Sequence, residues 1–292
     1  MEINVGAKTK LFCLIGSPVG HSGSPDIYNF AFKKHGIDSV YMAFDVTEEK
    51  VPDAINAMRT FGVRGANVTM PDKRASALCM DKLSPAAQII GAVNTIVNND
   101  GVFEGHITDG IGFVDNLRDH GVETKGANVV LVGAGGAGTA IYVQAVIEGA
   151  KSVRVYNSSS ANLERAKDTI KKVIEMYPGA DIKAVPLEDR ESFLSDIKNA
   201  DILINATPVG MHPNADKSII ADDELIAFHE GLAVADCVYN PVETKLLKQA
   251  KDKGLKAVDG TGMLLWQAVA AYKLYTGLDF PVEEYKAMKA KM

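Results

Sequence analysis

The amino-acid sequence predicts an α/β protein with two domains. The first observation is its length, because 292 residues suggest about two domains. The second is the alternation of short apolar strands with amphipathic helices, which indicates parallel sheets covered by helices. The third is a glycine-rich turn after the apolar run Asn128–Val132, which starts a second series of such elements.

The composition is typical of a globular protein and argues against several classes. The chain is 47% hydrophobic and 23% charged, with a net charge of −6 and no block of lysine or arginine. A nucleic-acid partner is therefore not expected. No apolar run approaches the roughly 18 residues of a membrane helix, and the N-terminal MEINVGAKTK lacks a signal peptide's apolar core. We therefore expect a cytoplasmic protein without a membrane partner.

The cysteines and histidines predict neither a disulfide nor a metal site. Cys13, Cys79 and Cys237 are odd in number and far apart, which is typical of reduced, buried thiols. The six histidines show no ligand spacing with the cysteines, so no metal is expected.

The first domain is expected over residues 1–108. Strands are predicted at 11–15, 39–46, 66–70, 93–97 and 102–105, with helices at 24–35 and 51–61. Ser24-Pro25 is a helix start, with a capping hydroxyl and a proline at the first helical position. The run Asn98-Asn99-Asp100-Gly101 predicts a hairpin turn.

The second domain is expected over residues 109–261, after a connector helix at 109–120. Its strands are predicted at 128–132, 152–156, 182–185, 201–205 and 232–236, with a weaker one at 256–258. Helices at 264–275 and 282–291 follow, and residues 262–292 are expected to return to the first domain and complete it.

The glycine-rich turn fits the dinucleotide motif G-x-G-x-x-G. Gly133 would make the tight turn, Gly135 would let the backbone approach a pyrophosphate, and Gly138 would let helix pack on strand. The following helix, predicted from Thr139, would offer N–H donors to the phosphates. The strand before and the helix after favour a Rossmann-type doubly wound domain over a glycine turn without a ligand.

The end of the second strand of this domain decides between NAD and NADP. An acidic residue there is typical of NAD enzymes, and NADP relatives carry arginine, but this chain has Asn157-Ser158-Ser159-Ser160. Arg154 and Arg165 are the nearest sources of positive charge, although one alternates along a strand and the other lies along a helix. Without a negative charge to repel a 2′-phosphate, NADP is slightly favoured and NAD stays possible.

Polar groups also gather where strands of the first domain end. The segments are Ser22–Ser24, Asn67–Lys73, Asn94–Thr95 and Thr108–Gly110. Ser22 and Ser24 at a helix N-terminus could hold a carboxylate, or Ser24 could only cap the helix. Lys73, in a loop constrained by Pro71, could equally be a surface lysine, and Asp109 a helix cap.

Together these segments resemble a known family. NVTMPDK, GAVNT, TDG, GAGGAG, NATPVGM and GTGMLLWQ occur in the order found in shikimate dehydrogenases. The resemblance spans nearly the whole chain, and YMAFDV, DCVYNP and GMLLWQ are most similar to the quinate/shikimate branch. It implies interconversion of shikimate and 3-dehydroshikimate with NADP or NAD, in aromatic amino acid biosynthesis (the chorismate pathway).

The resemblance also implies roles for individual residues. Lys73 and Asp109 match the catalytic pair that handles the hydroxyl proton as one coupled unit. The substrate-binding positions are Ser22, Ser24, Thr69, Asn94, Asp109, Tyr239 and Gln267. The cofactor-binding positions are Gly133, Ala134, Gly135, Gly136, Ala137, Gly138, Asn157, Ser158, Ser159, Ser160, Thr207, Gly260 and Met263.

One departure keeps alternatives open. Ile107 stands where the family usually has asparagine before the Thr-Asp pair, which could shift substrate geometry. The alternatives are a quinate or dual quinate/shikimate dehydrogenase, and a nucleotide-binding sensor that has lost catalysis. A folate or amino-acid dehydrogenase would lack the Ser-x-Ser and NVT-x-P-x-K motifs. The sequence leaves a monomer and a homodimer equally open.

Overall fold

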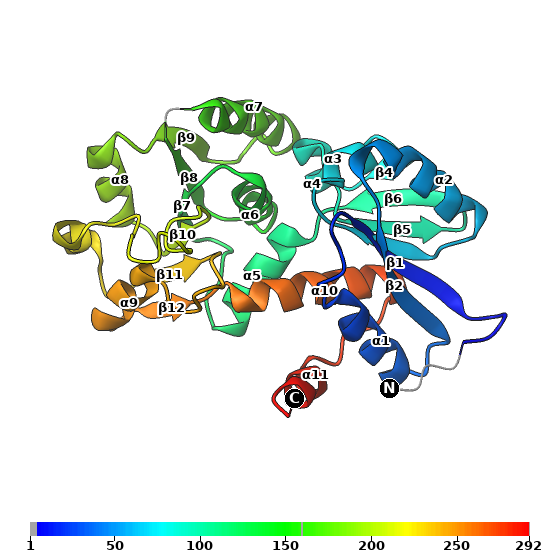
Figure 1. Ribbon diagram of the computed structural model, residues 1–292. Coiled ribbons are helices and arrows are strands. Elements are labelled where there is room, and N and C mark those ends of the chain that lie inside the picture. The colour runs from blue at the N-terminus through cyan, green and yellow to red at the C-terminus, as the bar shows by residue number, and fades with distance from the viewer. Residues whose placement is uncertain (1–4, 159, 292) are drawn as a thin grey trace. The chain divides into compact units, whose positions relative to one another are not determined.

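The chain folds into two compact α/β units, each built on a six-stranded sheet (Figure 1). The computed structural model describes residues 5–158 and 160–291. The first unit comprises Met1–Thr108 with Ala268–Met292, and the second comprises Asp109–Gln267. In the described part of the chain, no helix is long and apolar enough to cross a bilayer.

The first unit has a mixed sheet with the strand order β2-β1-β3-β5-β6-β4. The strands are β1 (Lys10–Gly16), β2 (Ser39–Asp45), β3 (Gly65–Val68), β4 (Lys82–Leu83), β5 (Thr95–Asn99) and β6 (Val102–His106). Strand β1 runs parallel to β2 and β3, whereas β5 is antiparallel to β3 and β6. The expectation of parallel sheets is therefore wrong for this part of the unit. The predicted hairpin turn accounts for the antiparallel pairing of β5 with β6, since Asp100 and Gly101 have φ of 52° and 97° and reverse the chain.

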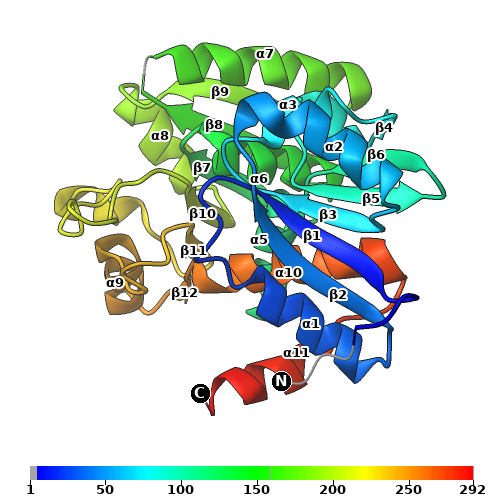
Figure 2. The same ribbon diagram turned by 45° about the vertical axis from the view of Figure 1, so that its right-hand side comes forward.

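Helices cover both faces of this sheet (Figure 2). They are α1 (Ser24–Lys34), α2 (Val51–Thr60), α3 (Lys73–Ala77), α4 (Pro85–Ile90), the end of α10 (Thr261–Thr276) and α11 (Val282–Lys289), with a 3-10 turn η1 (Glu48–Lys50). Residues of α2, α3 and α4 form one hydrophobic core with β1, β3, β5 and β6. On the other side, aromatic rings of α1 and α10 pack around Phe12, with ring centroids 4.9 Å from Phe32 and 5.2 Å from Tyr275.

Strand β2 lies at the edge of the first sheet, and a side chain of α1 covers part of that edge. The Asn29 Nδ2 donates to the Tyr41 carbonyl oxygen at 3.0 Å, and the Asn29 Oδ1 accepts from the Tyr41 N–H at 2.8 Å. The amide therefore fills both hydrogen-bonding positions of one edge residue, as a neighbouring strand would.

The second unit has a fully parallel sheet with the order β12-β11-β10-β7-β8-β9. The strands are β7 (Asn128–Val132), β8 (Ser152–Asn157), β9 (Ile182–Pro186), β10 (Ile202–Asn205), β11 (Ala233–Asp236) and β12 (Lys256–Val258). They lie within one residue of the predicted positions. The order reverses between β7 and β10, and ligands of doubly wound sheets bind at the carboxyl ends of strands at such a switch point.

Helices also cover both faces of the second sheet (Figures 1 and 2). They are α5 (Asp109–Asp119), α6 (Gly136–Ile147), α7 (Ala161–Met176), α8 (Arg190–Ile197), α9 (Lys245–Asp252) and the start of α10. The core between the sheet and helices α8 and α9 includes Tyr156, Phe193 and Leu247. The predicted α/β fold class is confirmed.

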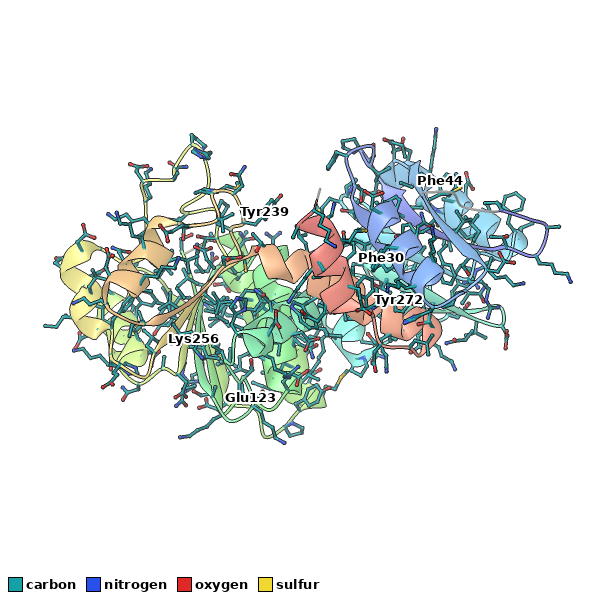
Figure 3. All side chains as sticks on the ribbon, turned by 90° about the horizontal axis from the view of Figure 1, so that it is seen from below. Phe30, Phe44, Glu123, Tyr239, Lys256 and Tyr272 are labelled. Atoms are coloured by element: carbon teal, nitrogen blue, oxygen red, sulfur yellow. The ribbon has the colours of Figure 1, made fainter. Side chains whose placement is uncertain are left out.

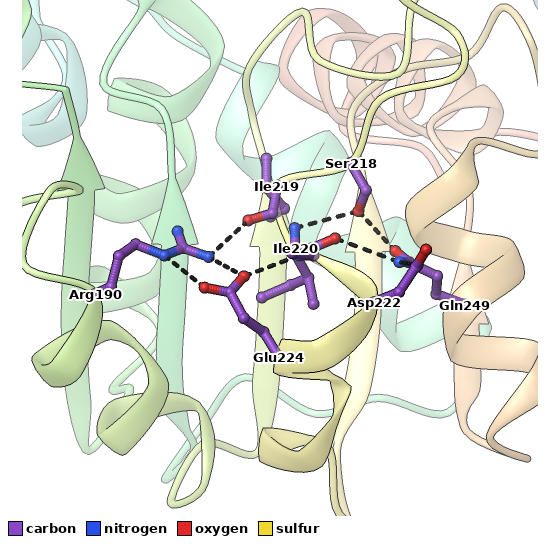
Figure 4. Close-up of polar contacts among 8 residues, drawn as sticks. Arg190, Ser218, Ile219, Ile220, Asp222, Glu224 and Gln249 are labelled. Atoms are coloured by element: carbon purple, nitrogen blue, oxygen red, sulfur yellow. Dashed lines mark hydrogen bonds and ion pairs between the residues drawn. The ribbon is translucent and has the colours of Figure 1, made fainter.

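The connection from β10 to β11 contains a 3-10 helix, η2 (Asp222–Ala227), fixed by side-chain bonds (Figure 4). The Glu224 carboxylate forms an ion pair with Arg190 and accepts from the Ala221 N–H at 2.8 Å. The Gln249 amide accepts from the Ser218 hydroxyl at 2.7 Å and donates to the Asp222 carboxylate at 2.7 Å. These contacts fasten η2 to α8 and α9.

Three thiols are free, but only one is buried as expected. Cys13 is buried in β1, whereas Cys79 and Cys237 are partly exposed. For the whole residues the prediction is therefore wrong at Cys79 and Cys237, which follow an element rather than lie inside one. The sulfur of Cys237 is nonetheless enclosed, since burial raises the pKa of its thiol.

Candidate functional site

The glycine loop after β7 is shaped by backbone contacts that exclude side chains. Gly133 has φ +108°, and a Cβ there would lie 2.7 Å from the Ala206 carbonyl carbon, in the loop after β10. A Cβ on Gly138 would lie 1.9 Å from the Gly133 carbonyl oxygen. Both positions therefore require glycine, and the loops after β7 and β10 meet at the switch point.

The next part of the loop is open and presents a helix N-terminus. A Cβ on Gly135 or Gly136 would meet nothing within 4 Å. Helix α6 begins at Gly136, not at Thr139 as predicted, and its N-cap Gly135 offers no side-chain hydrogen bond. The N–H groups of Gly136 and Ala137 have no intrahelical acceptor at such an end, whereas the Thr139 N–H already donates to the Gly135 carbonyl oxygen at 2.9 Å. Open space and unpaired donors fit the pyrophosphate of a dinucleotide.

The end of β8 is organised by Asn157, whose side chain turns into the protein. Its Oδ1 accepts from the Ala134 N–H at 2.9 Å, and its Nδ2 donates to the Ser158 carbonyl oxygen at 3.0 Å and the Ser160 hydroxyl at 3.1 Å. Asn157 thus ties this loop to the glycine loop and is only 9% exposed. Ser158 is exposed, Ser160 is the N-cap of α7, and Ser159 lies outside the described residues.

Both arginines considered for the 2′-phosphate are engaged in other contacts. The Arg154 guanidinium binds both carboxylate oxygens of Asp181, at 2.9 and 2.8 Å, just before β9. Arg165 donates to the Asn162 side chain on α7. The serines therefore remain the polar groups closest in sequence to the expected ribose position.

A buried network joins the loops after β10 and β11. The Thr207 hydroxyl donates to the Asn205 Oδ1 at 2.7 Å, and the Asn205 Nδ2 donates to the Asp236 Oδ1 at 2.9 Å. The Asp236 carboxylate also accepts from the Val238 N–H at 2.9 Å and the Thr244 hydroxyl at 2.7 Å. Burial raises the pKa of Asp236 from 3.8 to about 6. Sequence reasoning missed Asp236, although an acidic residue ending an apolar strand was a signal.

The loops after β11 and β12 also pack closely. A Cβ on Gly260 would lie 2.5 Å from the Cys237 carbonyl oxygen, so this position requires glycine as well. Met263 follows in the first turn of α10 and is partly exposed. Tyr239, on the loop after β11, has 55% of its surface exposed (Figure 3).

In the first unit, Asn94 anchors a buried polar cluster where β5 begins and β6 ends. Its Oδ1 accepts from the Thr108 N–H at 2.8 Å, the Thr108 hydroxyl at 3.2 Å and the Thr95 hydroxyl at 3.1 Å. The sequence predicted Asn94 inside a strand, but Asn94 immediately precedes β5, which begins at Thr95. Ile107 is buried beside Thr108 in the chain.

Asn67 joins this cluster to the neighbouring strands. Its Oδ1 accepts from the Tyr41 hydroxyl at 2.8 Å, and its Nδ2 donates to the Thr95 hydroxyl at 3.2 Å. The Val93 N–H donates to the Lys73 carbonyl oxygen at 2.9 Å, so the backbone of Lys73 is fixed next to Asn94. Lys73 is the first residue of helix α3, which corrects its predicted place in a loop.

The loops after β1 and β3 are also in contact. A Cβ on Gly16 would lie 2.3 Å from the Thr69 Cγ2, and the Ser17 N–H donates to the Met70 carbonyl oxygen at 3.2 Å. Thr69 and Lys73 therefore share one edge of the sheet with the chain leading to Ser22.

The two serines bond each other and do not cap helix α1. The Ser22 and Ser24 hydroxyls lie 3.2 Å apart, and the Ser24 N–H donates to the Ser22 hydroxyl at 3.2 Å. The N-cap of α1 is Gly23, without a side-chain bond, so the expected capping role of Ser24 is wrong. Both serine hydroxyls are thereby gathered at the N-terminus of this helix.

The remaining predicted residues lie in the second unit. Asp109 is the first residue of α5, and Gln267 lies on α10. A Cβ on Gly112 would lie 2.4 Å from the Gln267 nitrogen, so α5 passes close to α10 one turn after Asp109. Among the residues that the structure describes, no group of three or more His, Cys, Asp or Glu could hold a metal.

Two family models and several curated proteins match this chain. The family described as "Shikimate dehydrogenase substrate binding domain" matches residues 14–96, and "Shikimate 5'-dehydrogenase C-terminal domain" matches residues 260–291. A shikimate dehydrogenase (NADP(+)) of Streptococcus uberis is 45% identical over 98% of this chain and 97% of its own. A quinate/shikimate dehydrogenase of Escherichia coli is 42% identical over 97% of this chain and 98% of its own.

A solved structure gives the same result. The shikimate 5-dehydrogenase of Listeria monocytogenes, crystallised with shikimate and NAD, is 37% identical with a TM-score of 0.92 over 99% of both chains. With identity above 40% over almost the full length of curated relatives, the chain belongs to the shikimate dehydrogenase family.

Proposed function

We propose that the protein is an NAD(P)-dependent shikimate dehydrogenase that interconverts shikimate and 3-dehydroshikimate. The observation that carries this proposal is the 45% identity to a shikimate dehydrogenase over 98% of the chain. The open glycine loop at the switch point supports it, since a dinucleotide pyrophosphate fits that helix N-terminus. The reaction belongs to aromatic amino acid biosynthesis.

The residues of this chain divide the work by their chemistry. When bound, the dinucleotide supplies the acceptor for the hydride. Lys73 and Asp109 take the proton of the reacting hydroxyl as general acid–base groups. The paired hydroxyls of Ser22 and Ser24 bind the substrate carboxylate, and their mutual contact at 3.2 Å places both donors together.

The ring hydroxyls of the substrate are bound by Thr69, Asn94 and Gln267, with Tyr239 nearby. The contacts of Asn94 support this role. Its Oδ1 is held by three donors, which fixes the orientation of the amide. Fixed amide and hydroxyl groups select a hydroxylated ring, because an analogue lacking a hydroxyl leaves them unpaired.

The cofactor lies along the glycine loop, with Gly133–Gly138 at the pyrophosphate. Asn157 shapes the loop through its own hydrogen bonds, and the exposed Ser158 and the N-cap Ser160 would meet the 2′ position. Ser159, the third serine proposed for this position, lies outside the described residues. Thr207, Gly260 and Met263 follow strands of the other half of the sheet and contact the nicotinamide half. NADP is preferred by a small margin, since no acidic side chain ends β8.

Quinate is the second candidate substrate. A relative of 42% identity is named a quinate/shikimate dehydrogenase, and Ile107 replaces the family asparagine next to the polar cluster. The protein is further proposed to be cytoplasmic, as a monomer or homodimer, with no nucleic-acid partner.

Steady-state kinetics with two substrates and two cofactors test the proposal. Shikimate and quinate are each offered with NADP⁺ and NAD⁺, and formation of the reduced cofactor is followed by absorbance. Shikimate turnover confirms the proposal, and turnover of quinate alone replaces it with the second candidate. Dinucleotide binding without turnover of either substrate would establish a sensor.

A further inference from the structure

Asp236 places a buried carboxylate at the carboxyl end of β11. Its side chain is 0% exposed. Its hydrogen-bond donors are the Val238 N–H, the Asn205 amide and the Thr244 hydroxyl, all of them uncharged. Within the described residues it has no cationic partner. Burying an ion without a counter-ion is unfavourable, so a carboxylate at this position points to a role beyond packing.

The position of Asp236 relative to the sheet suggests that role. In doubly wound dinucleotide-binding folds, each half of the sheet binds one mononucleotide. The glycine loop follows β7 and Asn157 ends β8, so the adenosine half belongs there. The loops after β10 and β11 then serve the nicotinamide half, and Asp236 bonds to both through Asn205 and Val238.

The two redox forms of the cofactor differ in charge at this ring. The oxidised nicotinamide carries a positive charge, and the reduced ring is neutral. We propose that the Asp236 carboxylate raises the affinity of the protein for the oxidised dinucleotide relative to the reduced one. This inference rests on the proposed function, because it requires that the protein bind a nicotinamide dinucleotide.

The surroundings of Asp236 support a pH dependence of this preference. Burial raises the pKa of Asp236 from 3.8 to about 6, and no charged side chain of β10, β12 or α9 in the described part contributes. The titratable neighbour is the Cys237 thiol, whose pKa is itself raised by burial and by Asp236, so it stays neutral. The preference for the oxidised form therefore weakens as the pH falls through about 6.

Binding measurements without substrate test the inference. The dissociation constants of NADP⁺ and NADPH are measured by calorimetry for the wild type, Asp236→Asn and Asp201→Asn. The control removes a carboxylate that accepts from the Asn128 N–H at 2.7 Å, at the amino end of the same sheet. Asp236→Asn should weaken NADP⁺ binding on the order of tenfold relative to NADPH, because the neutral amide no longer attracts the positive charge of the oxidised ring. Asp201→Asn should leave the ratio unchanged.

The alternatives give different results. Equal loss of affinity for both forms would mean that Asp236 only holds the loops, and would overturn the inference. A wild-type affinity ratio that stays flat between neutral pH and pH 5 would overturn it without any variant. Failure of the wild type to bind either cofactor would overturn the proposed function as well.

Discussion

The glycine loop of the second unit and the polar cluster of the first are built by different means. In the loop, backbone atoms define the geometry, since a Cβ on Gly138 would lie 1.9 Å from the Gly133 oxygen. In the cluster, side chains define it, since the Asn94 Oδ1 alone accepts from three donors. A backbone-built site is damaged by adding an atom, whereas a side-chain-built site is damaged by removing one.

The largest effect is expected beside the cluster, at Lys73. Lys73→Ala should lower kcat by about 10²–10⁴, the usual range for removal of a general acid–base group. The KM for shikimate should change less, because the carboxylate and ring contacts remain. Arg74→Ala, an exposed neighbour on α3, is the matched control. Near-normal turnover of the Lys73 variant would refute the catalytic assignment.

Asp236 sharpens the comparison between the two sites, because its network is built from side chains but lies in the same unit as the glycine loop. Its pKa is raised from 3.8 to about 6, so the folded protein keeps a proton that the unfolded chain releases. Stability should therefore fall as the pH rises from about 4 to 7, by on the order of 3 kcal/mol from this group. Chemical unfolding across this range should show the slope in the wild type and its loss in Asp236→Asn. Identical slopes in the wild type and the variant would show that the pKa of Asp236 is not raised in the folded protein.

The two serines test whether removal of single atoms affects binding rather than folding. Ser22→Ala and Ser24→Ala should each raise KM more than they lower kcat. The loss in binding free energy should be roughly 1.5–3 kcal/mol for each, the value of a hydrogen bond to a charged group. Because Ser24 is not the cap of α1, Ser24→Ala should leave the unfolding midpoint nearly unchanged, whereas Ser22→Ala also removes the acceptor of the Ser24 N–H. If KM stays flat in both, the substrate carboxylate binds at other residues.

The glycine loop allows the opposite test, in which a methyl group is added. Gly138→Ala should destabilise the second unit by roughly 1–3 kcal/mol, since the backbone must move to accommodate the Cβ. Gly136→Ala is the matched variant, because its Cβ meets nothing within 4 Å. It should keep its stability and lose dinucleotide affinity, since the methyl group enters the expected pyrophosphate space. Thermal unfolding measures the loss of stability, and cofactor titration measures the loss of affinity. Equal losses of stability in Gly138→Ala and Gly136→Ala would contradict the view that backbone packing requires glycine at only one of the two positions.

The smallest effect is expected at Ser158, where a side chain adjusts a backbone-built site. Ser158→Arg should favour NADP by bidentate bonds to the phosphate, and Ser158→Asp should favour NAD by repelling it. The measure is the kcat/KM ratio for the two cofactors. An unchanged ratio in both variants would show that Ser158 does not face the ribose.

Hydrophobic periodicity predicted the long elements, because several turns or alternations make a period visible. Strand β7 has the predicted bounds Asn128–Val132. Helices α3 and α4 were missed, since five and six residues are too short to show a period. The cap of α4 was nonetheless readable, since Ser84 accepts from the Ala87 N–H at 3.4 Å just before Pro85.

The candidate site was predictable to a different degree in each unit. The glycine loop follows from spacing alone, because Gly133 and Gly138 have steric reasons to be glycine and Gly135 lies open at the start of α6. Lys73 and Asn94 were candidates at strand ends, but their roles came only from the family resemblance, because lone polar residues at strand ends have many explanations. The Asp236 network was not predicted, since its meaning depends on Asn205 and Thr244 approaching from other elements.

The Asn29 amide at strand β2 bears on the behaviour of the protein at high concentration. An exposed strand edge is a template on which another chain can add a strand and begin an aggregate. Asn29 occupies both backbone groups of Tyr41, in the middle of β2, so an incoming strand would first have to displace an existing pair of bonds. A single amide thus gives the first unit local protection against edge-to-edge association at Tyr41, away from Asp45, the charged residue at the end of the strand.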